Sequence, residues 1–527
     1  MKPIKIPNRW FYLLAIVLLL PALYINLGLL TFIDDEAIRA LVALEMKLSG
    51  NYITPTLNGA YYYNKPPLFN WILLVFFQLA GVFNEFVARI PTTLALMGYA
   101  ATIFYFSKKH FDTKTAFLNA FLLVTCGRVL FWDSMLALID ITFSWVTFTG
   151  FMVVFHTFQK GKFWQLFLLS YLLTATGFLM KGLPSVVFQG TTLLAWFVYN
   201  KRFKKLFSLE HIVGGLIFVG IVGGYYLVYH QYNDLREVFA TLFSESSKRT
   251  VVNYGWGRTI GHLFTFPFEM TYHFLPWSIL VIYLFRKGIK KILLANPFVV
   301  YCGLIFLANI LVYWSSPEVY PRYLLMLVPL LFTVFIYLHQ VHREENSWQF
   351  RFLNVLFLVV CAVIALGSFA PLFLERTQSA TWLWPKTMAL FVALFGLTYL
   401  YWRQREQRFL ALVLFLLVFR VGFNWFVLPD RNGEDYGDVC RQSSISASQH
   451  LKDKPLAVYK FTTMEPTNAF YLTNTRGAII ERKQGDFDPQ EYYIINPNEY
   501  PDARYEKIDS FYVRHRKTVY AIGQLIK

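Results

Sequence analysis

Acidic side chains are concentrated in a short segment directly after the first long apolar run of the chain. Asp34, Asp35 and Glu36 follow one another there, and Glu45 lies farther along the same segment. A carboxylate in such a position can accept a proton from a hydroxyl group in general base catalysis. The same residues also favour a helix start, because Asp34 can cap a helix whose dipole Asp35 and Glu36 complement. Spacing alone leaves both a catalytic carboxylate and a capped surface helix open.

The predicted helix has one apolar face, and this face indicates how the helix lies. Its apolar residues are Ile38, Leu41, Val42 and Leu48. A helix with such a stripe is expected to lie along a membrane surface. We expect it to end at Ser49–Gly50.

A membrane-embedded helical bundle is the predicted scaffold for these residues. Of 527 residues, 56% are hydrophobic and only 15% are charged, whereas a soluble domain has roughly 25% charged residues. Apolar runs of bilayer length recur from Phe11 to Leu428. We therefore expect an α-helical polytopic membrane protein with about thirteen transmembrane helices, near residues 10–32, 87–107, 113–130, 134–156, 163–180, 184–199, 209–230, 269–286, 295–314, 323–341, 352–372, 385–402 and 408–428.

Basic residues are clustered in alternate loops, as the positive-inside rule predicts. Examples are Lys108–Lys109, Lys201–Arg202 and Lys290–Lys291. The pattern places the N-terminus in the cytoplasm and three loops outside it, at 34–81, 233–267 and 315–321. Within the first of these loops, the apolar stretch 68–81 is short and is expected to lie on the membrane surface. The formal net charge of +17 thus follows from topology, and no zinc finger or basic helix suggests a nucleic-acid partner.

The last hundred residues differ from the rest in composition. Short strand-like runs at 456–461, 477–481, 492–495 and 518–522 alternate with turn residues, and a helix is expected over 444–451. We predict two domains: a membrane domain, 1–429, with the external loop 34–81, and a small α/β domain, 430–527. An odd number of crossings places the second domain outside the cytoplasm, in a multi-pass protein of the inner (plasma) membrane.

The cysteines give no sign of a disulfide framework or of a zinc site. The four are Cys126, Cys302, Cys361 and Cys440, and no pair has CxxC spacing. No cofactor is predicted with certainty, and a divalent metal stays an open alternative.

The external loop 34–81 resembles the first periplasmic loop of the GT-C superfamily of glycosyltransferases. The pattern that carries the resemblance is Asp35-Glu36, Glu45-Met46, Ser49-Gly50 and Lys65-Pro66, in that order and spacing. The most similar members are the aminoarabinose transferases of lipid A and the protein O-mannosyltransferases. The resemblance implies that Asp35 lies beside the bound sugar donor and that Lys65 contacts its phosphate.

Later segments fit the same resemblance. They are Arg89-Ile90-Pro91 at the start of a transmembrane helix, Asp140 as a second acidic position, Lys181-Gly182 between two helices, and Pro321-Arg322-Tyr323 with a donor-facing tyrosine. The resemblance implies catalytic roles for Asp35, Glu36 and Asp140. It implies binding of the donor phosphate or sugar by Lys65, Arg89, Lys181, Arg322 and Tyr323.

Each of these assignments has a simpler alternative. Asp133 lies close enough to Asp140 to be the matching residue. Lys181 can be a lysine that extends from a helix end towards water, and Arg89 can pair with an external carboxylate such as Glu85. Tyr323 is one of 33 tyrosines and can belong to an aromatic belt.

The resemblance implies an inverting glycosyltransferase. Such an enzyme moves a sugar from a polyprenyl phosphate donor to a lipid A, glycan or protein acceptor on the periplasmic face of the membrane. The alternative from another class is a transporter or flippase for a lipid or sugar, which usually has internal repeats and a site at the midplane. Asn64 stands where the aminoarabinose transferases have a glutamate, which weakens the case for a metal held by that carboxylate.

Overall fold

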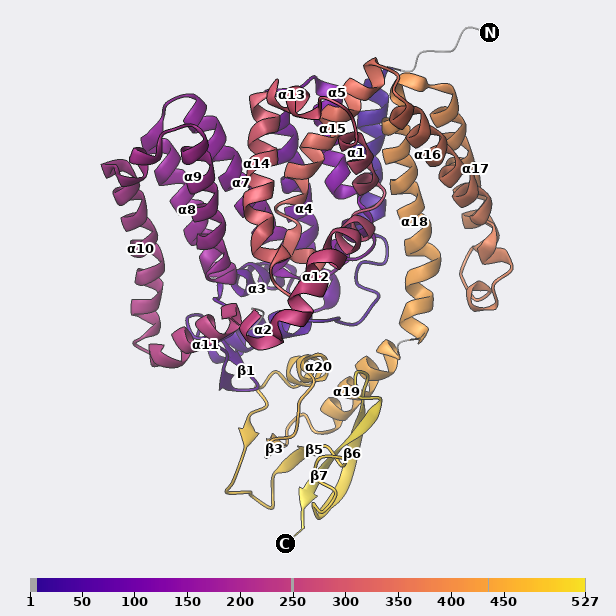
Figure 1. The fold of residues 1–527 in the computed structure, drawn as a ribbon. Coiled ribbons are helices and arrows are strands. Elements are labelled where there is room, and N and C mark those ends of the chain that lie inside the picture. The colour runs from indigo at the N-terminus through magenta and orange to yellow at the C-terminus, as the bar shows by residue number, and fades with distance from the viewer. Residues whose placement is uncertain (1–6, 248–250, 435, 527) are drawn as a thin grey trace.

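The molecule is a bundle of helices that carries a small β-sheet at one end (Figure 1). The computed structural model describes residues 7–247, 251–434 and 436–526, with side chains outside 246–256. The long axis of the bundle is set by α1 (Asn8–Tyr24), α4 (Glu85–Ser107), α5 (Thr113–Val124), α7 (Ile139–Gln159), α8 (Phe163–Lys181), α9 (Pro184–Tyr199), α10 (Leu209–Tyr229), α14 (Pro297–Trp314), α15 (Val328–Glu344), α16 (Trp348–Gly367), α17 (Leu383–Arg403) and α18 (Arg408–Glu434).

Shorter elements gather between this bundle and the C-terminal sheet (Figure 1). They come from the first predicted external loop and from the segment after α10. They are α2 (Glu36–Ser49), the hairpin β1 (Thr56–Leu57) and β2 (Ala60–Tyr61), α3 (Leu68–Ala80), α11 (Leu235–Ser247) and α12 (Val251–His273). Other short helices are α6 (Gly127–Phe131), α13 (Ile289–Leu294) and 3-10 turns, among them Asp133–Met135, Trp277–Leu284 and Pro321–Leu324.

Eight described helices are long and apolar enough to cross a bilayer, or nine if the bent pair Thr113–Val124 and Gly127–Met135 is one span. The protein is thus an integral multi-pass membrane protein. Three more predicted crossings lie on α1, α9 and α15, which have 17, 16 and 17 residues. Such helices are at the short end of what a bilayer needs, so the full number of about thirteen stays a prediction.

Two predicted crossings differ from the structure. The run 269–286 is not one helix, since α12 ends at His273 and a 3-10 helix occupies Trp277–Leu284. Pro276 between them lacks the N–H that a continuing α-helix needs. The run 10–32 ends as a helix at Tyr24, and Asn26 then adopts a left-handed conformation with φ of 60°. The remaining residues of that run form an irregular segment that leads to Asp34.

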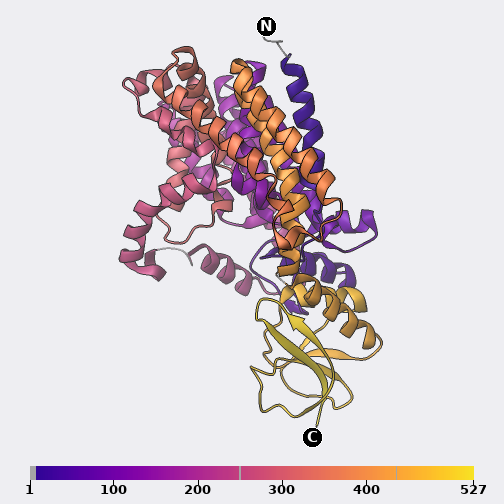
Figure 2. The same ribbon diagram turned by 90° about the vertical axis from the view of Figure 1, so that its right-hand side faces the viewer.

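The predicted basic loops meet at one end of the bundle. Lys114 at the start of α5 donates to the carbonyl of Glu406 before α18, and Gln407 donates to Asn8 at the start of α1 over 2.9 Å. In Figure 2 this end lies opposite the C-terminal sheet. The structure therefore separates the basic loops from the segments that were predicted to lie on the other side.

The C-terminal region contains a five-stranded sheet in the order β4-β3-β5-β7-β6. Its strands are β3 (Leu456–Tyr459), β4 (Arg482–Lys483), β5 (Tyr492–Ile495), β6 (Tyr505–Val513) and β7 (Thr518–Leu525), and its helices are α19 (Gly437–His450) and α20 (Pro466–Arg476). The strands β3, β4 and β5 are parallel, whereas β7 pairs antiparallel with β5 and β6. The predicted strands 456–461, 492–495 and 518–522 are confirmed, that at 477–481 is displaced to Arg482–Lys483, and β6 and α20 were not predicted.

Candidate functional site

Helix α2 begins at Glu36, and its start differs from the prediction. Asp34 does not cap the helix; it has a left-handed conformation with φ of 57°. The N-cap residue is Asp35, whose side chain makes no capping hydrogen bond. Instead, Glu36 accepts a hydrogen bond from the backbone N–H of Ile33 over 2.6 Å. Glu36 therefore closes the turn before the helix, and neither the Asp34 nor the Asp35 side chain caps it.

Most of α2 is enclosed, and only its last turn reaches the surface. Ten of its fourteen residues are buried, from Glu36 and Ala37 through Met46, because it packs between α3 and the C-terminal helix α20. Both faces of α2 therefore contact protein, and its position along the membrane surface stays a prediction. A single apolar stripe could not reveal that a second element, far along the chain, covers the other face.

Glu36 forms a buried ion pair with Arg89 of α4, at 2.7 Å. Its other oxygen accepts the backbone N–H of Ala137 over 2.8 Å. Arg89 also donates to the carbonyls of Leu27, Leu30 and Thr31. Glu36 is fully buried and Arg89 is 1% exposed, so this pair holds the irregular segment before Asp34 rather than facing a ligand. The alternative partner of Arg89, Glu85, pairs elsewhere.

Arg322 is the centre of the charged cluster at this end of the bundle. Its guanidinium donates to Asp34 and lies 3.7 Å from Asp35 and 3.6 Å from Asp140. Burial alone would lower the pKa of Arg322, but Asp140 and Asp34 raise it above its ordinary value. Of the three carboxylates, the Asp35 side chain is the most exposed, at 51%, and the Asp140 side chain is the least, at 9%. Asp35 is therefore the carboxylate that a ligand reaches most easily.

Lys181 connects this cluster to an open cavity. Its ammonium group donates to Asp140 over 2.5 Å and lies 4.1 Å from the centre of the Tyr323 ring. Lys181 is the last residue of α8, and Gly182 follows it with φ of 79°. That conformation favours glycine, which explains why a lysine–glycine pair ends the helix here. Asp140, not Asp133, is the partner of this lysine, since Asp133 pairs with Arg128 at 3.0 Å.

The cavity has a volume of about 340 Å³ and combines cations with an apolar wall. Lys65, Lys181 and Tyr323 line one part of it, and the carboxylates Glu245 and Glu318 also belong to the lining. Its apolar part comes largely from α9 and from the end of α14, and includes Leu183, Val187, Phe188 and Val312. Burial, together with the nearby Arg39 and Lys181, lowers the pKa of Lys65 to about 8. A buried cation in this setting favours an anionic ligand group.

Glu45 holds the hairpin that leads to Lys65. Its carboxylate accepts from the hydroxyl of Thr56 over 2.7 Å and from the backbone N–H groups of Asn58 and Gly59 over 2.6 and 3.2 Å. Burial raises the pKa of Glu45, and these hydrogen bonds oppose the rise. The sequence showed Glu45 only as part of a family pattern, and its partners could not be read from spacing.

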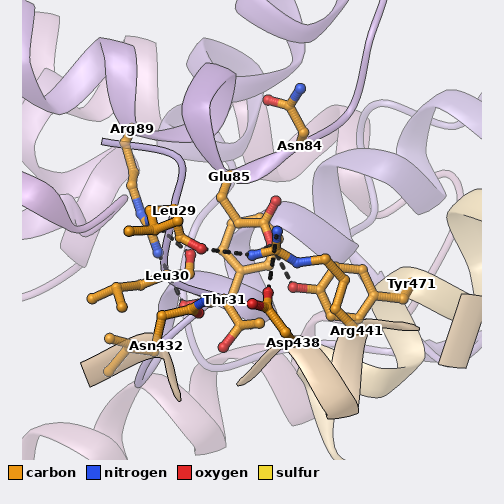
Figure 3. A network of polar contacts seen from close by, with 12 residues as sticks. Leu29, Leu30, Thr31, Asn84, Glu85, Arg89, Asn432, Asp438, Arg441 and Tyr471 are labelled. Carbon is orange, nitrogen blue, oxygen red and sulfur yellow. Dashed lines mark hydrogen bonds and ion pairs between the residues drawn. The ribbon is translucent and has the colours of Figure 1, made fainter. Parts of the chain in front are cut away.

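The C-terminal region holds the segment before Asp34 from the outside (Figure 3). Arg441 of α19 donates to the carbonyl of Leu29 over 3.0 Å and pairs with Glu85 at 3.1 Å. Tyr471 of α20 donates to the same Glu85. Arg514, after β6, donates to the Thr31 hydroxyl over 2.7 Å. The irregular segment 27–33 thus lies between Arg89 on the bundle side and these C-terminal residues on the other.

The predicted site residues therefore form two groups. Asp35, Lys65, Asp140, Lys181, Arg322 and Tyr323 meet at the cavity or at the charged cluster beside it. Glu36 and Arg89 form the buried pair described above. Sequence reasoning did not anticipate the ion pair of Asp34 with Arg322 or the supporting residues Arg441 and Arg514.

No ligand set for a metal is evident in this part of the molecule. Within the described ranges, no three His, Cys, Asp or Glu side chains are grouped so that they could hold an ion. The three aspartates near the cavity converge on the guanidinium of Arg322. In this structure the three carboxylates thus face the guanidinium of Arg322.

Known proteins resemble this chain in sequence and in fold. Residues 64–224 match the family model of dolichyl-phosphate-mannose-protein mannosyltransferases. An undecaprenyl phosphate-alpha-4-amino-4-deoxy-L-arabinose arabinosyl transferase of Proteus mirabilis is 28% identical over 43% of this chain and 41% of its own length. An uncharacterized protein of Aquifex aeolicus is 23% identical over 53% of this chain and 54% of its own. The chain thus spans about half, or less, of the length of these curated relatives.

The fold is similar to that of ArnT. The crystal structure of ArnT from Cupriavidus metallidurans bound to undecaprenyl phosphate covers 98% of both chains, with a TM-score of 0.70 and 17% sequence identity. The resemblance to GT-C glycosyltransferases of the ArnT type, expected from the loop pattern, is confirmed.

Proposed function

We propose that the protein is an inverting glycosyltransferase that takes a sugar from a polyprenyl phosphate donor on the extracytoplasmic face of the membrane. Its acceptor is a lipid, a glycan or a protein. The observation that carries this proposal is the cavity in which Lys65 and Lys181 face the apolar wall of α9 and α14. A lipid-linked phosphate needs both surfaces at once, cations for its charge and an apolar wall for its chain.

The cations would stabilise the departing phosphate. Transfer breaks the bond between the anomeric carbon and the phosphate, so the leaving group gains negative charge. Lys65, with its pKa lowered to about 8, still carries its proton at neutral pH and can donate to phosphate oxygens. Lys181 is next to Asp140 and Tyr323, so those residues fix where its ammonium group lies. Fixed charges that face the place where charge develops are an effective means of lowering a barrier.

Asp35 would act on the acceptor. Its carboxylate is half exposed and 3.7 Å from Arg322, so it is held in the charged cluster yet remains accessible. With a hydroxyl acceptor, Asp35 accepts the proton that the hydroxyl loses. With a phosphate acceptor, which is already ionised at neutral pH, Asp35 instead orients the reacting groups. Asp140 would position Lys181 and Arg322.

Glu36 and Arg89 take a positioning role in this proposal instead of contacting the donor. Both are buried, and Arg89 binds three backbone carbonyls of the segment that leads to Asp34 and Asp35. The pair thereby fixes the position of the segment that leads to the exposed carboxylates. Replacing Glu36 would therefore change the activity by displacing this segment.

The proposal places the protein in the inner (plasma) membrane with a cytoplasmic N-terminus and an extracytoplasmic C-terminal region. The basic loops at the end near α1 support this orientation, because such loops stay on the cytoplasmic side. The C-terminal sheet lies at the other end (Figure 2).

The experiment is mass spectrometry of lipid A, envelope glycans and secreted glycoproteins from cells with and without the protein. A sugar should disappear from one pool and return with the wild-type chain but not with Asp35→Asn. Asp486→Asn, in the C-terminal region, is the matched control and should restore the sugar. Unchanged pools, with a lipid-linked sugar accumulating on the cytoplasmic face, would contradict a transferase and support the flippase instead.

A further inference from the structure

A second cavity lies at the opposite end of the bundle, among the basic loops. It has a volume of about 930 Å³ and is lined by residues from the starts of α1 and α5, the end of α15, the first turns of α16 and the turn before α18. It shares no lining residue with the cavity that contains Lys65. The proposed transfer reaction does not use it.

The lining of this cavity is strongly basic. Five cationic side chains line it, and only two carboxylates, Asp112 and Glu406, accompany them. The five are Lys114, Arg343, Arg351, Arg405 and Arg408. Among the described residues, none of the five forms an ion pair within 4.0 Å. The described lining of the cavity therefore carries more positive than negative charge.

The carboxylates are partly occupied within the protein. Asp112 accepts from the backbone N–H of Thr115 over 2.9 Å and from Gln340 over 3.1 Å, as the cap of α5. Lys114 donates to the backbone carbonyl of Glu406, not to its carboxylate. An anion that enters the cavity thus meets cations with free donor capacity.

One wall of the cavity is apolar and continues into the bilayer. Phe350, Val355 and Leu358 of α16 line it. Along the same helix, outward-facing apolar side chains continue away from the basic end: Val355 is 61% exposed, Val359 53% and Val363 63%. Trp348 and Trp402 are more than half exposed near the cavity, as expected where a helix passes through the membrane interface. A ligand can therefore place an anionic group in the cavity and a hydrocarbon chain along α16.

We propose that this cavity binds the headgroup of an anionic phospholipid. Basic pockets between transmembrane helices on the cytoplasmic side suit such headgroups. The arginines offer paired N–H donors to phosphate oxygens. A zwitterionic headgroup would bind less favourably, because its own cationic group is repelled by the basic side chains. The bound lipid joins α1, α5, α15, α16 and α18 at the cytoplasmic end.

The test is native mass spectrometry of the purified full-length protein with phosphatidylglycerol, with phosphatidylcholine and with inorganic phosphate. The wild type should retain phosphatidylglycerol well above phosphatidylcholine. Removing three charges by Arg343→Gln, Arg351→Gln and Arg405→Gln should weaken retention roughly a hundredfold, because each basic residue near an anionic headgroup contributes about 1 kcal/mol, or about fivefold. The matched control removes three charges outside the cavity at the same end, by Lys160→Gln, Lys162→Gln and Lys290→Gln. It should retain phosphatidylglycerol nearly as well as the wild type does.

Three results would overturn the proposal: equal loss in both triple variants, equal retention of the two lipids, or full displacement of phosphatidylglycerol by millimolar inorganic phosphate. The last would identify a site for small anions. Because a triple variant can fail to fold, the exposed Arg405 is also changed alone, by Arg405→Glu, and its retention of phosphatidylglycerol is compared with that of Lys290→Glu. Equal retention in these two single variants would also contradict the lipid site.

Discussion

At the scale of single residues, the candidate site depends on which charges are already paired. Lys181 has Asp140 at 2.5 Å, and Arg322 is shared by three aspartates. Lys65 is held in its cationic form less firmly, because burial lowers its pKa to about 8. The lysine that we place on the donor phosphate is therefore the one that titrates near neutrality.

This lowered pKa gives a pH dependence for donor binding. As the pH rises through about 8, Lys65 loses its proton and its attraction for phosphate. We expect the KM for the donor to rise between about pH 7 and 9 and kcat to fall as well, because the same ammonium group stabilises the departing phosphate. Lys65→Arg should bind donor without this rise, since a guanidinium stays protonated over the whole range. A rise of the same size in Lys65→Arg would assign the titration to another group.

Substitutions of the neighbouring carboxylates Glu36 and Asp35 should differ in their effect on stability. Glu36→Gln leaves the buried Arg89 without its charged partner, which typically costs about 3–5 kcal/mol. We expect a clearly lower thermal unfolding midpoint in purified protein. Asp35→Asn should keep the wild-type midpoint, because Asp35 is half exposed. The reverse order of midpoints would contradict the positioning role of Glu36.

At the scale of elements, one buried side chain fixes the hairpin of the external loop to its helix. Glu45 joins α2 to the β1–β2 hairpin by three hydrogen bonds, and the hairpin leads to Lys65. Glu45→Gln keeps the shape but cannot accept from all three donors without turning an NH₂ group towards a backbone N–H. We expect at least a several-fold rise in the donor KM, measured with the neighbouring Lys47→Gln as control. An unchanged KM would show that the hairpin does not position Lys65.

The sequence predicted elements well where one local pattern decided them. Most transmembrane helices and the strands at Leu456–Tyr459 and Tyr492–Ile495 lie where expected. It failed where distant segments decide: α2 is enclosed by α20. It also failed at β6, whose exposed residues Glu506 and Lys507 give no apolar alternation until Phe511. The charge pattern of the loops, by contrast, correctly grouped Lys65, Lys181 and Tyr323 on one side.

At the scale of the whole molecule, the C-terminal region is part of the site's framework. Arg441 binds the segment 27–33 from outside, while Arg89 binds it from the bundle (Figure 3). Arg514 also donates to Thr31 of this segment. We expect Arg441→Gln to speed amide hydrogen exchange in this segment and to reduce transfer. Arg516→Gln, which removes an exposed pair with Glu499, is the control. Unchanged exchange in Arg441→Gln would mean that Arg89 and Arg514 hold the segment without Arg441.

The arrangement of both ends could be predicted only in outline. The alternation of basic loops established which segments share a side, since charge and hydropathy are properties of the sequence. The pairing of Arg441 with Glu85, 3.1 Å apart, depends on how the C-terminal region docks, and neither residue lies in a pattern that points to the other.

Binding of undecaprenyl phosphate to the purified protein tests the central claim most directly. The wild type should bind it, and Lys65→Gln with Lys181→Gln should bind at least tenfold more weakly, because a hydrogen bond to a charged group contributes about 1.5–3 kcal/mol. The control, Lys160→Gln with Lys162→Gln, removes equal charge at the far end and should bind as the wild type does. Equal affinity in all three proteins would contradict the assignment of this cavity to a polyprenyl phosphate donor.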